Sequence, residues 1–269
     1  MTESIIIERL NGTQYSLDDL EIHVISFDPP GPNYQYTWTQ MSEYNTVATD
    51  TQLQQTTIPL VIQIRAHDVY DYELMRQRVL KIFAGYEPFY VINLRIPYLR
   101  WKVVPEAYDF QRLSNFWFSQ PITINLTCAD GAAETVLSTT DNGFLSAFGY
   151  STNTVDIPQY SFKNKTSFNI WNGGILPLRA EERPMFITLD ASASSITIKN
   201  NTTGQSLTVN TTLSRGNPLT IYGLKMMVGT NSVFAKSNHA YLDFIPGNNS
   251  IAISGTTNFS VSFKTHFYY

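Results

Sequence analysis

The chain has 269 residues, of which 43% are hydrophobic and 15% are charged, and its formal net charge at pH 7 is −4. At about 150 residues per domain this length predicts two domains. The acidic excess argues against a protein that holds nucleic acid through phosphate contacts, because such binding needs a basic surface.

The beginning of the chain shows neither the basic residues nor the long apolar segment of a signal peptide. No apolar run approaches the roughly 18 residues that are needed to cross a bilayer. A single cysteine, Cys128, excludes an intrachain disulfide, and its place in an alternating strand favours a core position over a reactive thiol. We therefore expect a soluble protein that is made in a reducing cytoplasm.

The first predicted elements are strands with alternating apolar residues. They cover residues 4–10, 19–27 and 58–66, and the third strand places four large aliphatic side chains on one face: Ile58, Leu60, Ile62 and Ile64. His23 falls on the face opposite to the apolar residues of its strand, so we expect it to be solvated.

Residues 28–57 separate the second strand from the third and show no sustained periodicity of either kind. A loop of this length inside a compact domain is unusual and usually marks a functional arm or disorder, and its aromatic residues argue against disorder. The interpretation we favour is an arm that docks on another subunit, and the alternative is a hairpin folded on its own domain. The candidate contact residues are Tyr34, Tyr36, Trp38 and Tyr44.

One helix is predicted over residues 69–85, where five apolar residues recur at helical spacing: Met75, Val79, Ile82, Phe83 and Tyr86. Asp68 or Asp71 can cap its first turn. Gly85 is suited to a left-handed position after the last turn, and Pro88 prevents continuation. Nothing in the apolar stripe suggests catalysis, so we expect a helix that covers a sheet.

Strands rich in aromatic and basic residues follow the helix, and a further strand ends at Cys128. Small polar residues over 129–143 suggest a boundary, which gives domains 1–135 and 136–269. The second domain reads as eight short strands separated by turn sequences, which predicts a β-sandwich. These strands are "SFNIWNGG", "RPMFITLD", "SSITIKN", "SLTVNTT", "PLTIYG", "AYLDFIPG", "NSIAISG" and "FSVSFKTHFYY".

The search for catalytic or ligand-binding motifs finds almost nothing. The four histidines show no metal-ligand spacing, and there is no nucleophile elbow, phosphate-binding glycine loop or dinucleotide fingerprint. The acidic pair Glu181–Glu182 lies in a predicted turn, where solvation is the ordinary state. We expect no enzyme activity, cofactor or metal.

The order of the elements is more informative than any one of them. "AHDVYDYELMRQRVLKIFAGYEPFYV" runs from the helix into an aromatic strand, and "IPYLRWKVVPE" is a basic and aromatic strand that follows a proline. The second half contains "FNIWNGG", "RPMFITLDASASSITIKNNTTGQSLTV" and "YLDFIPGNNSIAIS". With these motifs in this order, nearly the whole chain resembles the distal tail proteins of long-tailed (siphovirus-type) bacteriophages.

The resemblance implies a mainly β fold in which an N-terminal, sandwich-like domain with one helix and an arm forms a hexameric ring. A galectin-like C-terminal β-sandwich would project from this ring. The ring would be a structural hub of the virion tail tip or baseplate, assembled in the host cytoplasm, with a central channel for the tape-measure protein and DNA. Its implied partners are the tail tube protein, a tail-associated hydrolase or tail-tip protein, and receptor-binding proteins. Larger relatives carry an inserted carbohydrate-binding module, for which this chain has no room.

Two further expectations concern particular side chains. A channel that passes DNA should avoid basic residues on its wall. We therefore expect Arg95, Arg100 and Lys102 at contacts with neighbouring subunits or with the tube, or else outside the pore altogether. The alternative function is a stand-alone glycan-binding protein, in which Trp171 or Tyr222 would stack on a sugar.

Overall fold

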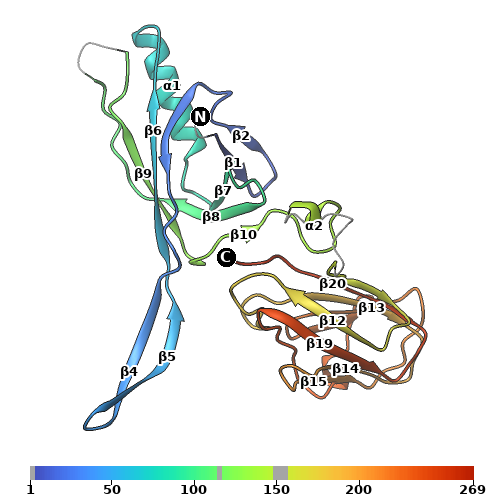
Figure 1. Ribbon diagram of the computed structural model, residues 1–269. Coiled ribbons are helices and arrows are strands. Elements are labelled where there is room, and N and C mark those ends of the chain that lie inside the picture. Colours follow the sequence, from blue (N-terminus) through green and yellow to red (C-terminus); the bar gives the residue numbers. More distant parts are fainter. Residues whose placement is uncertain (1–3, 114–116, 148–156) are drawn as a thin grey trace. The chain divides into compact units, whose positions relative to one another are not determined.

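The structure is a computed structural model that describes residues 4–113, 117–147 and 157–269. The chain divides into two compact units, residues 1–136 and 137–269, each with its own hydrophobic core. Strands dominate both units (Figure 1), which confirms the mainly β fold.

The first unit is built on an antiparallel sheet with the strand order β2-β1-β7-β8-β9-β6-β3, to which β10 adds by pairing with β8. The strands are β1 (Ile5–Arg9), β2 (Gln14–Ser16), β3 (Ile22–Phe27), β6 (Thr56–Ile64), β7 (Phe89–Asn93), β8 (Leu99–Pro105), β9 (Ile122–Cys128) and β10 (Glu134–Thr135). Every second residue of β6 from Ile58 to Ile64 is fully buried, as the alternation predicts. His23 is exposed, whereas the Cys128 thiol is buried in the core.

The helix α1 (Val69–Ile82) covers this core with Tyr72, Met75, Val79 and Ile82. Of the two proposed caps, Asp68 is the one used: its side chain accepts hydrogen bonds from the backbone N–H groups of Tyr70 and Asp71. The predicted stripe is wrong at its end, because Tyr86 lies beyond the helix and is 79% exposed.

The predicted glycine cap of α1 is also wrong. Gly85 does not have a positive φ, and the helix ends at Phe83. The last carbonyl oxygens instead accept hydrogen bonds from the guanidinium of Arg9, at 3.2 Å for Lys81, 2.7 Å for Ile82 and 3.0 Å for Ala84. A cation at this end also suits the helix dipole.

The second unit is a sandwich of a six-stranded sheet (β11-β20-β13-β16-β17-β18) and a four-stranded sheet (β12-β19-β14-β15) that share one core. The larger sheet contains β11 (Ser161–Lys163), β13 (Phe186–Ala191), β16 (Leu219–Tyr222), β17 (Lys225–Val228), β18 (Asn231–Ser232) and β20 (Phe259–Lys264). The smaller sheet contains β12 (Ser167–Asn172), β14 (Ile196–Asn200), β15 (Ser206–Val209) and β19 (Gly247–Ser254). Two short helices were not predicted: α2 (Phe144–Ala147) and the 3-10 helix η1 (Phe234–Lys236).

One predicted strand of this unit is wrong. Residues 240–246 form only an isolated bridge, between Phe244 and Leu178, and Gly247 belongs to β19. Side chains of β14 and of the turn after it bond the backbone here: Gln205 accepts from the N–H of Asp243 at 2.6 Å, and Asn200 donates to the carbonyl of Asp243 at 2.8 Å. These side-chain bonds take the place of a strand ladder.

Candidate interaction surface

The segment over residues 28–57 contains a long β-hairpin of β4 (Tyr34–Ser42) and β5 (Asn45–Leu53). Within the described part of the chain these two strands pair only with each other. Figure 1 shows this hairpin extending beyond the end of the sheet that contains β6. Every residue of β4 is exposed, and so is every residue of β5 except Leu53. The segment is therefore an exposed arm with the form of a hairpin, and it is not packed on its own domain as the alternative proposed. Its docking on another subunit stays a prediction.

One face of the hairpin is aromatic. Tyr34, Tyr36 and Trp38 are two residues apart along β4, so their side chains point to the same side. The rings of Tyr36 and Trp38 lie 5.8 Å apart between centroids, and the Trp38 side chain is 62% exposed. Tyr44, in the turn, is 91% exposed. Aromatic side chains in such positions are enriched in the cores of protein interfaces.

Polar side chains occupy most of the rest of the hairpin, beside the exposed Met41 and Val47, and several of them bond to one another. The hydroxyl groups of Thr39 and Thr49 are 3.2 Å apart, and Thr49 also donates to the Thr37 carbonyl. The Thr46 hydroxyl donates to the Gln40 side chain at 2.7 Å. The hairpin is thus amphipathic, and its apolar face is uncovered within the part of the chain that the structure describes.

The base of the hairpin is fixed to the first unit. The Gln54 N–H donates to the Asn33 carbonyl at 2.8 Å, and this hydrogen bond joins the two ends of the hairpin just outside β4 and β5. Gly131, in the turn after β9, approaches this point so closely that a Cβ there would lie 2.3 Å from the Gln54 carbonyl oxygen. Its φ of +64° also favours glycine.

The three basic residues that the sequence singled out are in different environments. Arg100 is held by two carboxylates, with Glu134 at 2.7 Å and Glu8 at 2.9 Å, and its guanidinium lies 3.9 Å from the centroid of the Tyr90 ring. Lys102, on β8, is half-buried and lies opposite Tyr90 of β7. Arg95 is exposed in the loop after β7. Burial raises the pKa of Tyr90, and the Glu134 carboxylate raises it further.

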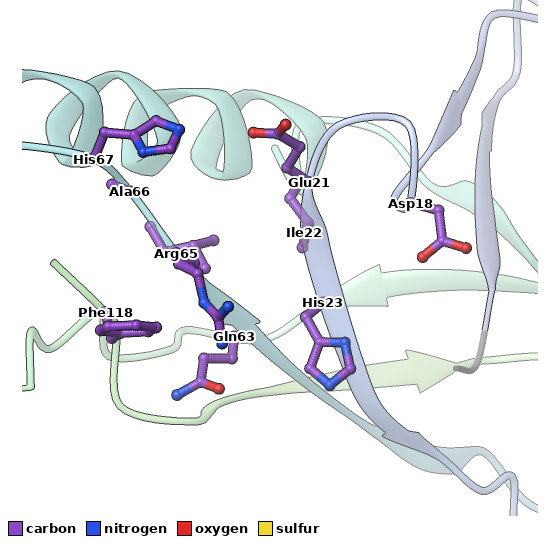
Figure 2. A pocket seen from close by; sticks show the side chains of 10 residues that line it. Asp18, Glu21, Ile22, His23, Gln63, Arg65, Ala66, His67 and Phe118 are labelled. Carbon is purple, nitrogen blue, oxygen red and sulfur yellow. The ribbon is translucent and has the colours of Figure 1, made fainter. Parts of the chain in front are cut away.

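A groove of about 540 Å³ lies where β3 begins and β6 ends (Figure 2). Two histidines, two carboxylates and one guanidinium contribute to it: His23, His67, Asp18, Glu21 and Arg65. Arg65 packs against the Phe118 ring, with its guanidinium carbon 4.8 Å from the centroid. Sequence reasoning missed this groove because its residues come from four separate segments without a motif.

The groove adjoins a free sheet edge. Among the described residues β3 pairs only with β6, and β2 at the other end of the same sheet pairs only with β1. The two edges differ in length and sequence, and unpaired edges can pair with strands of another chain. The first unit therefore offers two unlike surfaces for association in addition to the aromatic hairpin face.

The described residues show no group of three or more His, Cys, Asp or Glu side chains that could hold a metal ion. No helix in this part of the chain is long and apolar enough to cross a membrane.

Comparisons with known proteins place both units. A family model for the phage tail protein RIFT-related domain matches residues 10–128, and one for the C-terminal domain of the siphovirus-type tail component matches residues 179–267. Most of the chain is covered by these two matches. The chain belongs to the siphovirus distal tail proteins.

One solved structure in particular has the same fold as this distal tail protein. The crystal structure of the SPP1 Dit protein, described as a paradigm of the hub adsorption apparatus in phages that infect Gram-positive bacteria, matches with a TM-score of 0.70. The match has 11% sequence identity and covers 98% of this chain and 99% of that chain. The activated baseplate of phage P2 with Ca matches with a TM-score of 0.49 and 8% identity over 98% of each chain. A comparison with curated protein sequences gives no match.

Proposed function

We propose that this distal tail protein is a structural hub of the tail tip or baseplate and acts as a ring of six copies around a central channel. The observation that carries the proposal is the uncovered aromatic face of β4, with Tyr34, Tyr36 and Trp38 on one side of an exposed hairpin. The hub role named for SPP1 Dit, a protein of the same fold, supports it.

The sheet edges support a ring in a second way. Each subunit of a closed ring uses two different surfaces, one on each neighbour. The first unit has two unlike free edges, at β3 and β2, and the hairpin can lie on a neighbour beside one of them. Tyr34, Tyr36, Trp38 and Tyr44 are then contacts between subunits.

The proposed partners above and below the ring are the tail tube protein, the tape-measure protein and a tail-tip protein or tail-associated hydrolase, with receptor-binding proteins at its side. Arg95 and Lys102 are assigned to contacts with a neighbour or the tube. Arg100 is paired with Glu8 and Glu134, so a partner that contacts Arg100 must meet these two carboxylates as well. The role is one of assembly in the virion, without catalysis.

The mass of the purified protein in solution tests the ring. Six copies of a 30.5 kDa chain give about 183 kDa by light scattering and native mass spectrometry. The double variant Tyr36→Thr/Trp38→Ser should stay at the mass of one chain, because it removes the aromatic contact. Its matched control, Thr37→Ser/Thr39→Ser on the other face of β4, should form the ring. A full ring of the aromatic variant would show that the hairpin face is not a subunit contact.

A further inference from the structure

The outer face of the larger sheet in the second unit carries a row of side chains that the tail-hub role does not use. Phe186 on β13 is opposite Lys264 on β20 and Tyr222 on β16, and Tyr222 is in turn opposite Lys225 on β17. The row is thus two neighbouring aromatic rings with a lysine at each end. The ring centroids of Phe186 and Tyr222 are 6.1 Å apart, and the side chains are 38% and 51% exposed.

A groove of about 420 Å³ follows this row. Its lining combines the two aromatic rings with a hydroxyl, an ammonium group, a thioether and a turn glycine: Phe186, Tyr222, Thr220, Lys225, Met227 and Gly229. The neighbouring row on the same face continues with further hydroxyl groups, from Thr188 and Ser262. None of the lining residues is acidic.

These groups match the chemistry of a sugar that carries a negative charge. The faces of aromatic rings take up the apolar C–H face of a pyranose, and hydroxyl groups both donate to and accept from sugar hydroxyls. An ammonium group binds a phosphate or carboxylate by a charge-assisted hydrogen bond. Lys225 is suited to this because it makes no ion pair with a described residue, whereas Lys264 lies 4.0 Å from the carboxylate of Asp141.

We propose that the groove formed by Phe186, Tyr222 and Lys225 is a binding site for an anionic saccharide, with the sugar ring on the two aromatic rings and its phosphate or carboxylate at Lys225. The charge of the groove favours such a ligand over a neutral sugar, and its hydroxyl groups favour a sugar over an apolar protein surface. The site lies wholly within the second unit, so it does not depend on the ring of the proposed function.

Ligand-observed saturation-transfer NMR on the full chain tests the site, because it works for a single chain and for a large assembly. The probes are glucose 6-phosphate, glucuronate, glucose and inorganic phosphate. We expect saturation of the sugar-ring protons of both anionic sugars, with weaker signals for glucose. Whether the phosphate or the carboxylate sugar gives the tighter titration identifies the preferred anion.

Three variants locate the binding. Tyr222→Thr keeps a strand-forming residue and should weaken binding of glucose 6-phosphate by about tenfold. Lys225→Gln should weaken it by roughly two- to fivefold and leave glucose unchanged, since an exposed ion pair contributes little. Tyr241→Thr changes another exposed tyrosine of the same unit, outside the groove, and should bind as the unchanged protein does.

Several results would overturn the proposal. One is that none of the sugars shows saturation transfer. Another is that the variant Tyr222→Thr gives the same saturation-transfer signal as the unchanged protein. Competition by inorganic phosphate as strong as that by glucose 6-phosphate would reduce the site to simple anion binding. If Tyr222→Thr lowers the mass of the assembly and no sugar binds, the face is an interface between copies of the chain instead.

Discussion

Arg9 connects the first strand to the end of α1, the longest helix among the described residues. Only 5% of Arg9 is exposed, and its guanidinium donates to three carbonyl oxygens at the C-terminus of α1. The guanidinium also lies 5.3 Å from the centroid of the Tyr86 ring and 5.0 Å from that of Phe89. One side chain thus satisfies carbonyl groups that a C-cap glycine would otherwise serve.

Replacing Arg9 should therefore destabilise the first unit. We expect Arg9→Met to lower the free energy of unfolding by about 2–4 kcal/mol, because it keeps the apolar stem but removes the guanidinium donors from the carbonyl groups at the end of the helix. Arg76→Met, on the same helix, loses only a half-exposed ion pair with Glu73 and a contact with the Phe110 ring, so it should cost less than about 1 kcal/mol. Urea unfolding followed by tryptophan fluorescence measures both, and equal losses for the two variants would disprove this role of Arg9.

Tyr72 gives a prediction about alkaline pH. Its hydroxyl is buried and has no hydrogen-bond partner among the described residues, and burial raises the pKa of its phenol, with a further contribution from Glu73. The unfolded chain releases this proton near pH 10, at which the folded chain still holds it. The free energy of unfolding should then fall as the pH rises above about 10.

The variant Tyr72→Phe isolates this effect. Near neutral pH it should be as stable as the unchanged protein or more stable by up to about 1 kcal/mol, because it removes an unsatisfied hydroxyl. Above about pH 10 its stability should fall less steeply. Tyr90 and Tyr108 also have a pKa raised by burial, so a smaller slope should remain. Urea titrations at several pH values check this, and identical slopes for the two proteins would contradict it.

At the scale of elements, the hairpin of β4 and β5 is separable from the core. None of its residues is fully buried, and the hydrogen bond from Gln54 to Asn33 already brings its two ends together. Replacing residues 34–53 with an Asn-Gly turn should change the free energy of unfolding by less than about 1 kcal/mol, since surface changes rarely cost more. The shortened protein should be a folded monomer.

The comparison for this experiment is Ile62→Ala in β6, the strand that follows the hairpin. Ile62 is fully buried, so its truncation should cost about 2–5 kcal/mol. Circular dichroism and urea unfolding measure both proteins. If the shortened protein loses as much free energy of unfolding as Ile62→Ala, the hairpin supports the core. If the shortened protein still forms a full ring, the hairpin is not part of the interface between subunits.

Elements that bury one face could be predicted from the sequence, and elements that bury none could not. The alternation from Ile58 to Ile64 and the helical spacing from Met75 to Ile82 reflect contact with one core, so the sequence carries the period of each element. β5 has solvent on both faces and shows no such period. Tyr34, Tyr36 and Trp38 do alternate in β4, and this was the signal that could have identified the strand.

Contacts between distant segments account for the other differences. Arg9 is 72 residues from the nearest carbonyl group to which it donates. No local sequence pattern could therefore predict that Arg9, rather than Gly85, caps the end of the helix. Residues 240–247 contain apolar residues at strand-like spacing, but Gln205 and Asn200 bind their backbone. The grooves at His23 and at Tyr222 each combine several strands, and their chemistry exists only once the sheets have formed.

For the whole molecule, the net charge decides how strongly a ring of this protein would bind DNA in its channel. Six copies at −4 give a net charge of −24. Two cations of the first unit are engaged within the fold: Arg9 by carbonyl groups and Arg100 by Glu8 and Glu134. A channel that must let DNA pass benefits from this arrangement, because each free cation on its wall would bind a phosphate and release counterions.

The protein should therefore bind duplex DNA weakly, with a dissociation constant above about 0.1 mM at physiological salt. Fluorescence anisotropy of a labelled duplex at low and at physiological salt measures this. The double variant Glu8→Gln/Glu134→Gln removes the two carboxylates from Arg100 and changes the net charge from −4 to −2 per chain. If carboxylates keep phosphates away, this variant binds more tightly and loses that binding as salt is added. Tight, salt-sensitive binding by the unchanged protein would instead place uncompensated cations where DNA can reach them.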